Sequence, residues 1–175
     1  LHFTLTEMGL GKTYTGSEKM ATYDNRVNLI ICQKSKVNDW VNHMKNHYPV
    51  RIQVYDLTKP KEYRTFCGVA IGDKYRVVGV INYELAWRRD DLWMLKDFTM
   101  MLDESSLIQN RKAKQTKFIL KLKPSHVILL SGTPVGGKYE NLWTQLHLMG
   151  WDISEKLYEK QYVNWKTIEA GGMIH

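Results

Sequence analysis

The fold is decided by a glycine-rich stretch near the N-terminus, Thr6-Glu7-Met8-Gly9-Leu10-Gly11-Lys12-Thr13. It follows a short strand-like run and precedes a segment with helical periodicity, which is the order of a Walker A phosphate loop. Gly9 and Gly11 let the backbone wrap around phosphates, whose negative charge the start of the following helix favours. Lys12 is expected to reach the outer phosphates and Thr13 to hold Mg²⁺, whereas the first loop position, usually glycine, is threonine here. The residues predicted to bind nucleotide are Met8, Gly9, Leu10, Gly11, Lys12, Thr13 and Tyr14.

A buried strand that ends in acids is the second element of such a site, and residues 98–104 supply it as Phe-Thr-Met-Met-Leu-Asp-Glu. Asp103 is expected to orient Mg²⁺, and Glu104 to position and activate the water that attacks the γ-phosphate. Acid pairs are common at strand ends, so the pair alone does not indicate a nucleotide site. It does so here because an apolar strand precedes it and the chain also contains a phosphate loop. The predicted catalytic residues are Lys12, Asp103 and Glu104, and the predicted metal ligands are Thr13 and Asp103.

A Ser-Gly-Thr-Pro sequence at residues 131–134 ends the next predicted strand. Turn chemistry alone explains such a sequence anywhere in a protein. In a parallel sheet, however, Ser131 and Thr133 would lie beside Glu104. We therefore predict that both couple the state of the γ-phosphate to the rest of the domain.

Short apolar runs alternate with longer amphipathic segments along the chain, which predicts an α/β fold with a central, mostly parallel sheet and helices on both faces. Strands are predicted near residues 3–6, 27–32, 51–55, 76–81, 98–103 and 126–131. Helices are predicted near residues 12–22, 36–47, 89–96, 111–122, 138–149 and 154–165. We expect one domain over residues 1–150, followed by a helical tail over residues 151–175.

The composition is that of a folded globular protein, since 43% of the 175 residues are hydrophobic and 25% are charged. Cys32 and Cys67 have no ligand spacing, so we predict free, buried thiols in a reducing compartment. No run approaches the roughly 20 apolar residues that span a bilayer, so we expect no membrane partner and an intracellular location in cytoplasm, nucleus or nucleoid. The net charge of +7 only weakly favours an acidic partner such as a nucleic acid.

Taken together, the motifs and their order resemble the Swi/Snf-like ATPases of helicase superfamily two, which are DEAD/DEAH-box-related. The phosphate loop is similar to the family's first motif. Residues 29–35, followed by Trp40, resemble motif Ia with Gln33 in place of the usual proline. Residues 80–84 resemble the Ser/Thr-Tyr-Glu element.

Motifs II and III also have counterparts. Residues 102–106, Leu-Asp-Glu-Ser-Ser, resemble a DEAH-type motif II in which Ser106 replaces the histidine. Residues 130–134 resemble motif III, with Gly136 and Gly137 in place of the Gln-Asn that usually follows.

The resemblance implies a RecA-like fold, ATP and Mg²⁺ as cofactors, ATP hydrolysis, and double-stranded DNA as the track. Family members close a second RecA-like lobe over the ATP and supply arginines from it. The tail would lead toward such a lobe, which lies outside these 175 residues. We therefore expect this chain alone to bind nucleotide weakly and to hydrolyse it slowly or not at all.

Candidate nucleic-acid contacts lie at two places in the sequence. Lys34 and Ser35 stand between a strand and a helix start, where they suit a DNA phosphate or serve only as a helix cap. Asn82 and Tyr83 belong to the second place, where the tyrosine also fits simple packing. Basic residues between 111 and 123 fit the solvated face of an amphipathic helix, and Trp40, Trp87 and Trp143 fit anchors of the core or of a lobe interface.

Three other functions remain open from the sequence. The first is a strand-separating helicase of the same superfamily. The second is a P-loop kinase or metabolic NTPase that does not act on DNA. The third is an interaction module that kept the fold and lost the chemistry, because Thr6, Ser106 and Gly136 depart from the family's pattern.

Overall fold

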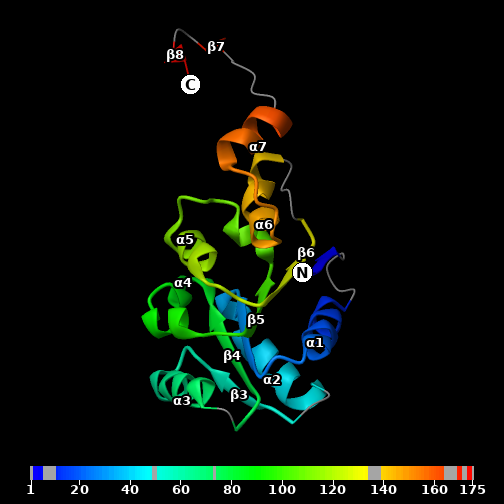
Figure 1. The fold of residues 1–175 in the computed structure, drawn as a ribbon, viewed down its shortest axis with the longest axis vertical. Coiled ribbons are helices and arrows are strands. Elements are labelled where there is room, and N and C mark those ends of the chain that lie inside the picture. Colours follow the sequence, from blue (N-terminus) through cyan, green and yellow to red (C-terminus); the bar gives the residue numbers. More distant parts are fainter. Residues whose placement is uncertain are drawn as a thin grey trace.

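The computed structural model describes residues 2–5, 11–48, 51–72, 74–133, 139–163, 169–170 and 173–174. Six strands form one parallel sheet in the order β1-β6-β5-β2-β4-β3 (Figure 1). Their bounds are β1 His2–Leu5, β2 Val27–Cys32, β3 Gln53–Asp56, β4 Val77–Asn82, β5 Phe98–Asp103 and β6 His126–Ser131. A parallel sheet of this kind gathers the carboxyl ends of its strands at one edge, where ligands bind in open α/β sheets.

Helices cover both faces of the sheet. Their bounds are α1 Lys12–Tyr23, α2 Val37–His47, α3 Pro60–Ile71, α4 Tyr83–Ala86, α5 Lys114–Lys121, α6 Trp143–Leu148 and α7 Glu155–Tyr162. Helices α1 and α2 pack on one face, where their apolar side chains meet Ile30 and Met101. Helices α3, α4 and α5 contribute to the other apolar layer, which contains Leu29, Ile31 and Leu102. Successive strand residues therefore enter opposite layers, which explains why the central strands are apolar at almost every position.

Short turns and a small second sheet complete the described chain. Single 3₁₀ turns occupy Lys34–Lys36, Asp90–Met94, Ser105–Ile108 and Tyr139–Leu142. The two-residue strands β7 Glu169–Ala170 and β8 Met173–Ile174 pair in antiparallel orientation. In the segment predicted as a helical tail, helix is thus confined to α7 among the described residues, and the boundary at residue 150 stays a prediction.

Helix α7 is held against the preceding chain by side-chain contacts. The ring of Tyr158 is 3% exposed, and its hydroxyl donates a hydrogen bond of 2.6 Å to the carbonyl oxygen of Tyr139. Arg111 forms ion pairs with Glu155 and Glu159 of this helix. The indole N–H of Trp143 donates to the carbonyl oxygen of Ile153 at 2.9 Å. These contacts attach the start of the predicted tail to the sheet domain.

The predicted α/β architecture and all six strands are confirmed, with strand ends shifted by at most two residues. Several helix predictions were wrong in extent. The segment 89–96 contains only the 3₁₀ turn Asp90–Met94, and the helix expected at 138–149 is α-helical only from Trp143 to Leu148. The helix expected at 111–122 is shortened to α5, because residues 111 and 112 form a turn that precedes it.

Helix α3 was not predicted. It begins with Pro60 in its first turn and ends before Gly72, and both are ordinary helix-boundary signals. It buries Tyr63 and Phe66 against β3 and β4. Phe66 lies so close to Gly79 of β4 that a Cβ on that glycine would be 2.9 Å from the phenyl ring.

The two cysteines are free thiols, as predicted. Cys32 is fully buried at the end of β2, and burial raises the pKa of its thiol, which keeps it protonated and unreactive. Cys67 on α3 is partly buried. Within the part of the chain that is described, no helix combines the length and apolar character needed to cross a membrane.

Gly16 brings α1 close to the sheet, and its replacement tests this packing. A Cβ at this position would lie 2.7 Å from Met101 Sδ and 2.9 Å from Leu130 Cδ1, both in fully buried side chains. We expect Gly16→Val to lower the free energy of unfolding by about 2 kcal/mol, because the extra atoms overpack a filled site. Urea unfolding measures the change.

Gly68 provides the matched control, since it lies inside α3 and no described atom stands within 4 Å of an added Cβ. Gly68→Ala should raise the free energy of unfolding by roughly 0.5–1 kcal/mol, because alanine is the better helix former. Equal effects of the two substitutions would show that α1 does not rest on the sheet as described.

Candidate functional site

A cavity of about 480 Å³ opens at the carboxyl edge of the sheet, between the start of α1, the end of β5 and the start of α2. Six of the residues predicted for the nucleotide site line this cavity: Gly11, Lys12, Thr13, Tyr14, Asp103 and Glu104. The predicted nucleotide-binding residues Met8, Gly9 and Leu10 lie outside the described residues. The two halves of the predicted site, about 90 residues apart in the sequence, therefore face one space.

The start of α1 is described from Gly11, the last glycine of the predicted phosphate loop. Gly11 caps the helix with φ of +79°, a left-handed conformation that glycine adopts without strain. Its carbonyl oxygen accepts the first helical hydrogen bond, from the backbone N–H of Thr15 at 3.0 Å. Lys12 Nζ lies 3.9 Å from Glu104 Oε2, and both side chains are more than four-fifths buried. The lysine thus points across the cavity toward the acidic strand end.

Asp103 is held from two sides. The indole N–H of Trp40, on α2, donates a hydrogen bond of 2.8 Å to Asp103 Oδ2. The hydroxyl of Tyr83, on α4, donates to the backbone oxygen of Asp103 at 3.0 Å. Burial raises the pKa of the Asp103 carboxyl above its usual value, and the hydrogen bond from Trp40 works against that rise. The position and the ionisation of this carboxylate therefore depend on α2.

Glu104 occupies a left-handed backbone conformation, with φ of +55°, which is uncommon for a residue other than glycine. Its Oε1 accepts hydrogen bonds from Ser106 Oγ at 2.7 Å and from Ser131 Oγ at 2.9 Å. Ser131 Oγ in turn accepts the backbone N–H of Thr133 at 3.1 Å. Non-glycine residues in such conformations persist where the surrounding contacts fix them, and they cluster at functional sites.

The predicted neighbourhood of Ser131 and Glu104 is thus present, and Ser106, in place of histidine, takes part in it. Thr133 is connected to the Glu104 carboxylate indirectly, because its backbone N–H donates to Ser131 Oγ, which in turn donates to Glu104. The side chain of Thr133 is exposed. The coupling role of both residues stays a prediction.

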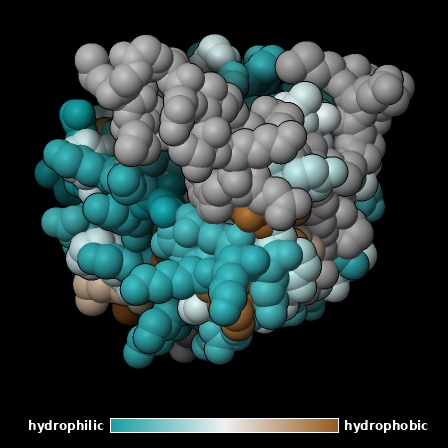
Figure 2. All heavy atoms as spheres, turned by 90° about the horizontal axis from the view of Figure 1, so that it is seen from above, coloured by the Kyte–Doolittle hydropathy of each residue, from teal (hydrophilic) through white to brown (hydrophobic). Residues whose placement is uncertain are grey.

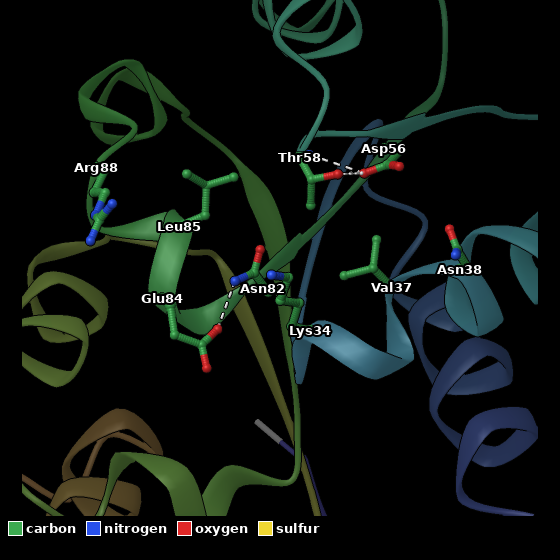
Figure 3. Close-up of a pocket in the computed structure, with 9 residues that line it drawn as sticks. All are labelled: Lys34, Val37, Asn38, Asp56, Thr58, Asn82, Glu84, Leu85 and Arg88. Atoms are coloured by element: carbon green, nitrogen blue, oxygen red, sulfur yellow. Dashed lines mark hydrogen bonds between the residues drawn. The ribbon is translucent and has the colours of Figure 1, made fainter.

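A second cavity, of about 530 Å³, lies beyond the carboxyl ends of β2, β3 and β4 (Figure 3). Lys34 and Asn82, both predicted to contact nucleic acid, line it together with Arg88. The amide of Asn82 donates a hydrogen bond of 2.6 Å to Glu84 Oε2, and Asp56 Oδ1 accepts from the backbone and the hydroxyl of Thr58. Both carboxylates of the cavity are therefore engaged by the protein itself.

The nucleic-acid contact of Tyr83 stays a prediction, although the structure places this side chain in the interior. Its ring is 1% exposed and belongs to the apolar layer beneath α4, and its hydroxyl is directed to Asp103. Packing, the other interpretation of this residue, agrees with this burial. Ser35 is exposed in the turn beside Lys34 but does not line the cavity.

Several lining residues were not predicted as part of a site. Gln33, Lys36, Asp39 and Trp40 line the first cavity, and Arg88 lines the second. Trp40 was interpreted as a core or interface anchor, which agrees with its 2% exposure but omits its bond to Asp103. One signal in the sequence could have indicated these residues. Helix α2 begins directly after the turn that follows β2, so its first residues lie at the carboxyl edge of the sheet, where the cavities open.

The basic segment around α5 behaves as an amphipathic helix. Phe118 and Ile119 are buried, while Lys114, Lys117 and Lys121 are exposed, as expected for a solvated basic face. Figure 2, seen from above relative to Figure 1, shows a face on which hydrophilic side chains predominate among the coloured residues. Because the lysines of α5 are exposed, positive charge is not confined to the two cavities.

The fold and the first cavity together define a class. A parallel α/β sheet, a helix that begins at Lys12 after a left-handed glycine, and an acidic strand end facing that lysine form a RecA-like domain of the P-loop NTPase class. Comparison with known families then gives the family: the SNF2-related domain matches residues 5–170. The chain belongs to this family, whose members are ATPases.

Curated relatives support the assignment of the chain to this family. The chain is 29% identical over 147 residues to the SWI/SNF-related matrix-associated actin-dependent regulator of chromatin subfamily A-like protein 1 of Drosophila melanogaster, a match that covers 82% of the chain and 18% of that protein. It is 25% identical over 152 residues to the ISWI chromatin-remodeling complex ATPase CHR11 of Arabidopsis thaliana, covering 82% of the chain and 14% of that relative. The chain thus spans about a fifth or less of the lengths of these proteins.

A solved structure supports the fold. The Sulfolobus solfataricus SWI2/SNF2 ATPase core, determined in complex with double-stranded DNA, matches with a TM-score of 0.69 and 22% sequence identity. The match covers 93% of the chain and 34% of that core. At this identity it establishes the RecA-like fold.

Proposed function

We propose that the chain is the ATP-binding lobe of a motor that couples ATP hydrolysis to movement on double-stranded DNA. The observation that carries the proposal is the first cavity, where Lys12, Thr13, Asp103 and Glu104 converge. A nucleotide's phosphates would lie at the start of α1, where the exposed N–H groups and the helix dipole attract negative charge. The curated relatives, which are named as chromatin regulators and remodelling ATPases, support this assignment.

The donor groups of the cavity fit Mg²⁺. Thr13 supplies a hydroxyl and Asp103 a carboxylate, which are hard oxygen ligands, and both line the same cavity. Magnesium in nucleotide sites typically uses only one or two protein ligands besides phosphate and water, so a larger protein cluster is not required. When bound, the ion would neutralise charge on the β- and γ-phosphates.

The remaining residues would divide the chemistry. Lys12 would stabilise negative charge on the outer phosphates. Glu104 would accept a proton from the attacking water, and the hydroxyls of Ser106 and Ser131 would hold its carboxylate in the cavity. Ser131 is then placed to respond when Glu104 changes its partner, which is the coupling role proposed for it and, through its backbone, for Thr133.

A second RecA-like lobe would complete the site. In phosphoryl-transfer enzymes, arginines brought to the γ-phosphate raise the rate by about 10³-fold or more. The chain spans 34% of the solved SWI2/SNF2 core, which leaves room for such a lobe in proteins of that length. We propose that turnover requires it.

The second cavity would contact the DNA backbone through Lys34 and Arg88, whose side chains are exposed at its rim. We expect Lys34→Ala and Arg88→Ala each to weaken duplex binding by about threefold to tenfold, because each removes one solvent-exposed phosphate contact, which is worth about as much as an ordinary hydrogen bond. The slope of log affinity against log salt should become shallower by about 0.9 for each phosphate interaction that is removed. Fluorescence anisotropy with labelled duplex DNA at several salt concentrations measures both effects in the full-length protein.

Lys45→Ala is the matched control, since Lys45 is an exposed lysine on α2 that does not line the second cavity. It removes the same charge from the helix that follows Lys34. If Lys45→Ala weakened binding and reduced the salt slope as much as Lys34→Ala, the proposed DNA contact at the second cavity would be wrong.

A further inference from the structure

Trp40 joins α2 to the acidic strand end through one buried hydrogen bond. Its indole N–H lies 2.8 Å from Asp103 Oδ2, although the two residues are 63 positions apart in the sequence. The side chain is 2% exposed, and it also lines the first cavity. A buried indole N–H generally needs an acceptor, and here the acceptor is the carboxylate that is predicted to hold the metal.

Trp40 has a ring neighbour on α2 that is connected to α1. The rings of Trp40 and His43 form a T-shaped pair, with centroids 5.9 Å apart and planes at 84°. His43 Nε2 shares a buried hydrogen bond of 2.9 Å with Ser17 Oγ on α1. Trp40 therefore contacts a histidine that is itself hydrogen-bonded to α1.

An indole N–H suits this task chemically. Indole donates a hydrogen bond but carries no charge, so it orients a carboxylate without cancelling the charge that a cation needs. A lysine or arginine in the same place would compete with the metal. Groups that hold a metal ligand from behind commonly change metal affinity by 10- to 100-fold when they are removed.

We infer that Trp40 is a positioning residue for the proposed magnesium site, and this inference rests on the proposed function. Trp40 holds Oδ2 of Asp103 and so restricts the orientation of the carboxylate that lines the first cavity. Helix α2 begins next to Lys34 and Ser35, so the same helix reaches from the second cavity to the metal ligand.

The test measures nucleotide binding without turnover. A fluorescent ADP analogue is titrated into the full-length protein with and without Mg²⁺, and Mg²⁺ is titrated at fixed nucleotide. Trp40→Phe should raise the Mg²⁺ concentration for half-saturation about tenfold and leave the Mg²⁺-free nucleotide affinity unchanged. In an Asp103→Asn background the same substitution should have no further effect, because the two residues act as a pair.

Trp143→Phe is the matched control. It also removes an indole hydrogen bond of 2.9 Å, to the carbonyl oxygen of Ile153, but lies outside the cavity. It should leave the Mg²⁺ dependence as in the parent protein. If Trp40→Phe does not fold, benzothienylalanine at position 40 replaces the N–H with sulfur and keeps the ring shape.

Two results would overturn the inference, and they differ in what else they reject. A parent protein that binds ADP with Mg²⁺ dependence, together with a Trp40 variant of unchanged Mg²⁺ dependence, would reject only the role of Trp40. A parent protein whose nucleotide binding does not respond to Mg²⁺ would reject the proposed magnesium site as well.

Discussion

Glu104→Gln is expected to lower the rate of ATP hydrolysis by about 10²- to 10⁴-fold while nucleotide binding persists. Glutamine has nearly the same shape, and its amide oxygen can still accept the hydrogen bonds that Ser106 and Ser131 donate. It cannot accept a proton from the attacking water. The change therefore removes the base without removing the site. Phosphate release by the full-length protein with duplex DNA measures the rate, and ATP-analogue titration measures binding.

Glu18→Gln is a suitable control for this experiment, because Glu18 is exposed on α1 and does not line the cavity. It makes the same chemical change on the helix that carries Lys12, and it should retain the parent rate. A Glu104→Gln protein with a third or more of the parent rate would assign the water-activating role to another group.

Lys12→Ala should weaken ATP binding by roughly 10- to 150-fold, which corresponds to the 1.5–3 kcal/mol of a hydrogen bond to a charged group. The lysine is the cation nearest to Glu104 among the described ion pairs, at 3.9 Å, and it points across the cavity. Its loss leaves the phosphates without a mobile positive charge. The substitution also leaves the acidic strand end unpaired, which adds repulsion toward ATP. Equilibrium titration with an ATP analogue measures the effect.

Lys19→Ala on the same helix serves as the comparison. Lys19 lies two turns further along α1, where its Nζ is 5.0 Å from the centre of the Tyr23 ring. Lys19→Ala removes one positive charge that lies away from the cavity, so ATP affinity should change by less than about twofold. If both variants bound ATP equally, Lys12 would not contact the phosphates.

The strands of the sheet were predictable because each is specified by a short stretch of consecutive residues. Each central strand, such as Val27–Cys32, is a short apolar run, since both of its faces are covered by helices. The convergence of Lys12 and Glu104 followed from topology, because carboxyl ends of parallel strands share one edge. Helix α3 was not predicted, although Pro60 and Gly72 mark its two ends, because boundary signals carry less information than a run of apolar residues.

Side-chain partners between distant segments were not predictable in the same way. The contact between Trp40 and Asp103 depends on how α2 crosses the sheet, and no spacing rule in the sequence specifies that crossing. The direction of Tyr83 has a similar origin: the turn from β4 into α4 places its ring inward and its hydroxyl on Asp103. Both residues lie in recognisable motifs, but the motifs do not say which groups they touch.

The ATPase rate of the full-length protein, measured with and without duplex DNA, tests the central claim most directly. We expect duplex DNA to raise the rate several-fold or more, and Glu104→Gln to remove both the basal and the stimulated rate. A rate that duplex DNA leaves unchanged would contradict a DNA-driven motor and favour a nucleotide-hydrolysing enzyme that acts on something else. A stimulated rate that survives Glu104→Gln would contradict the proposed chemistry of the first cavity.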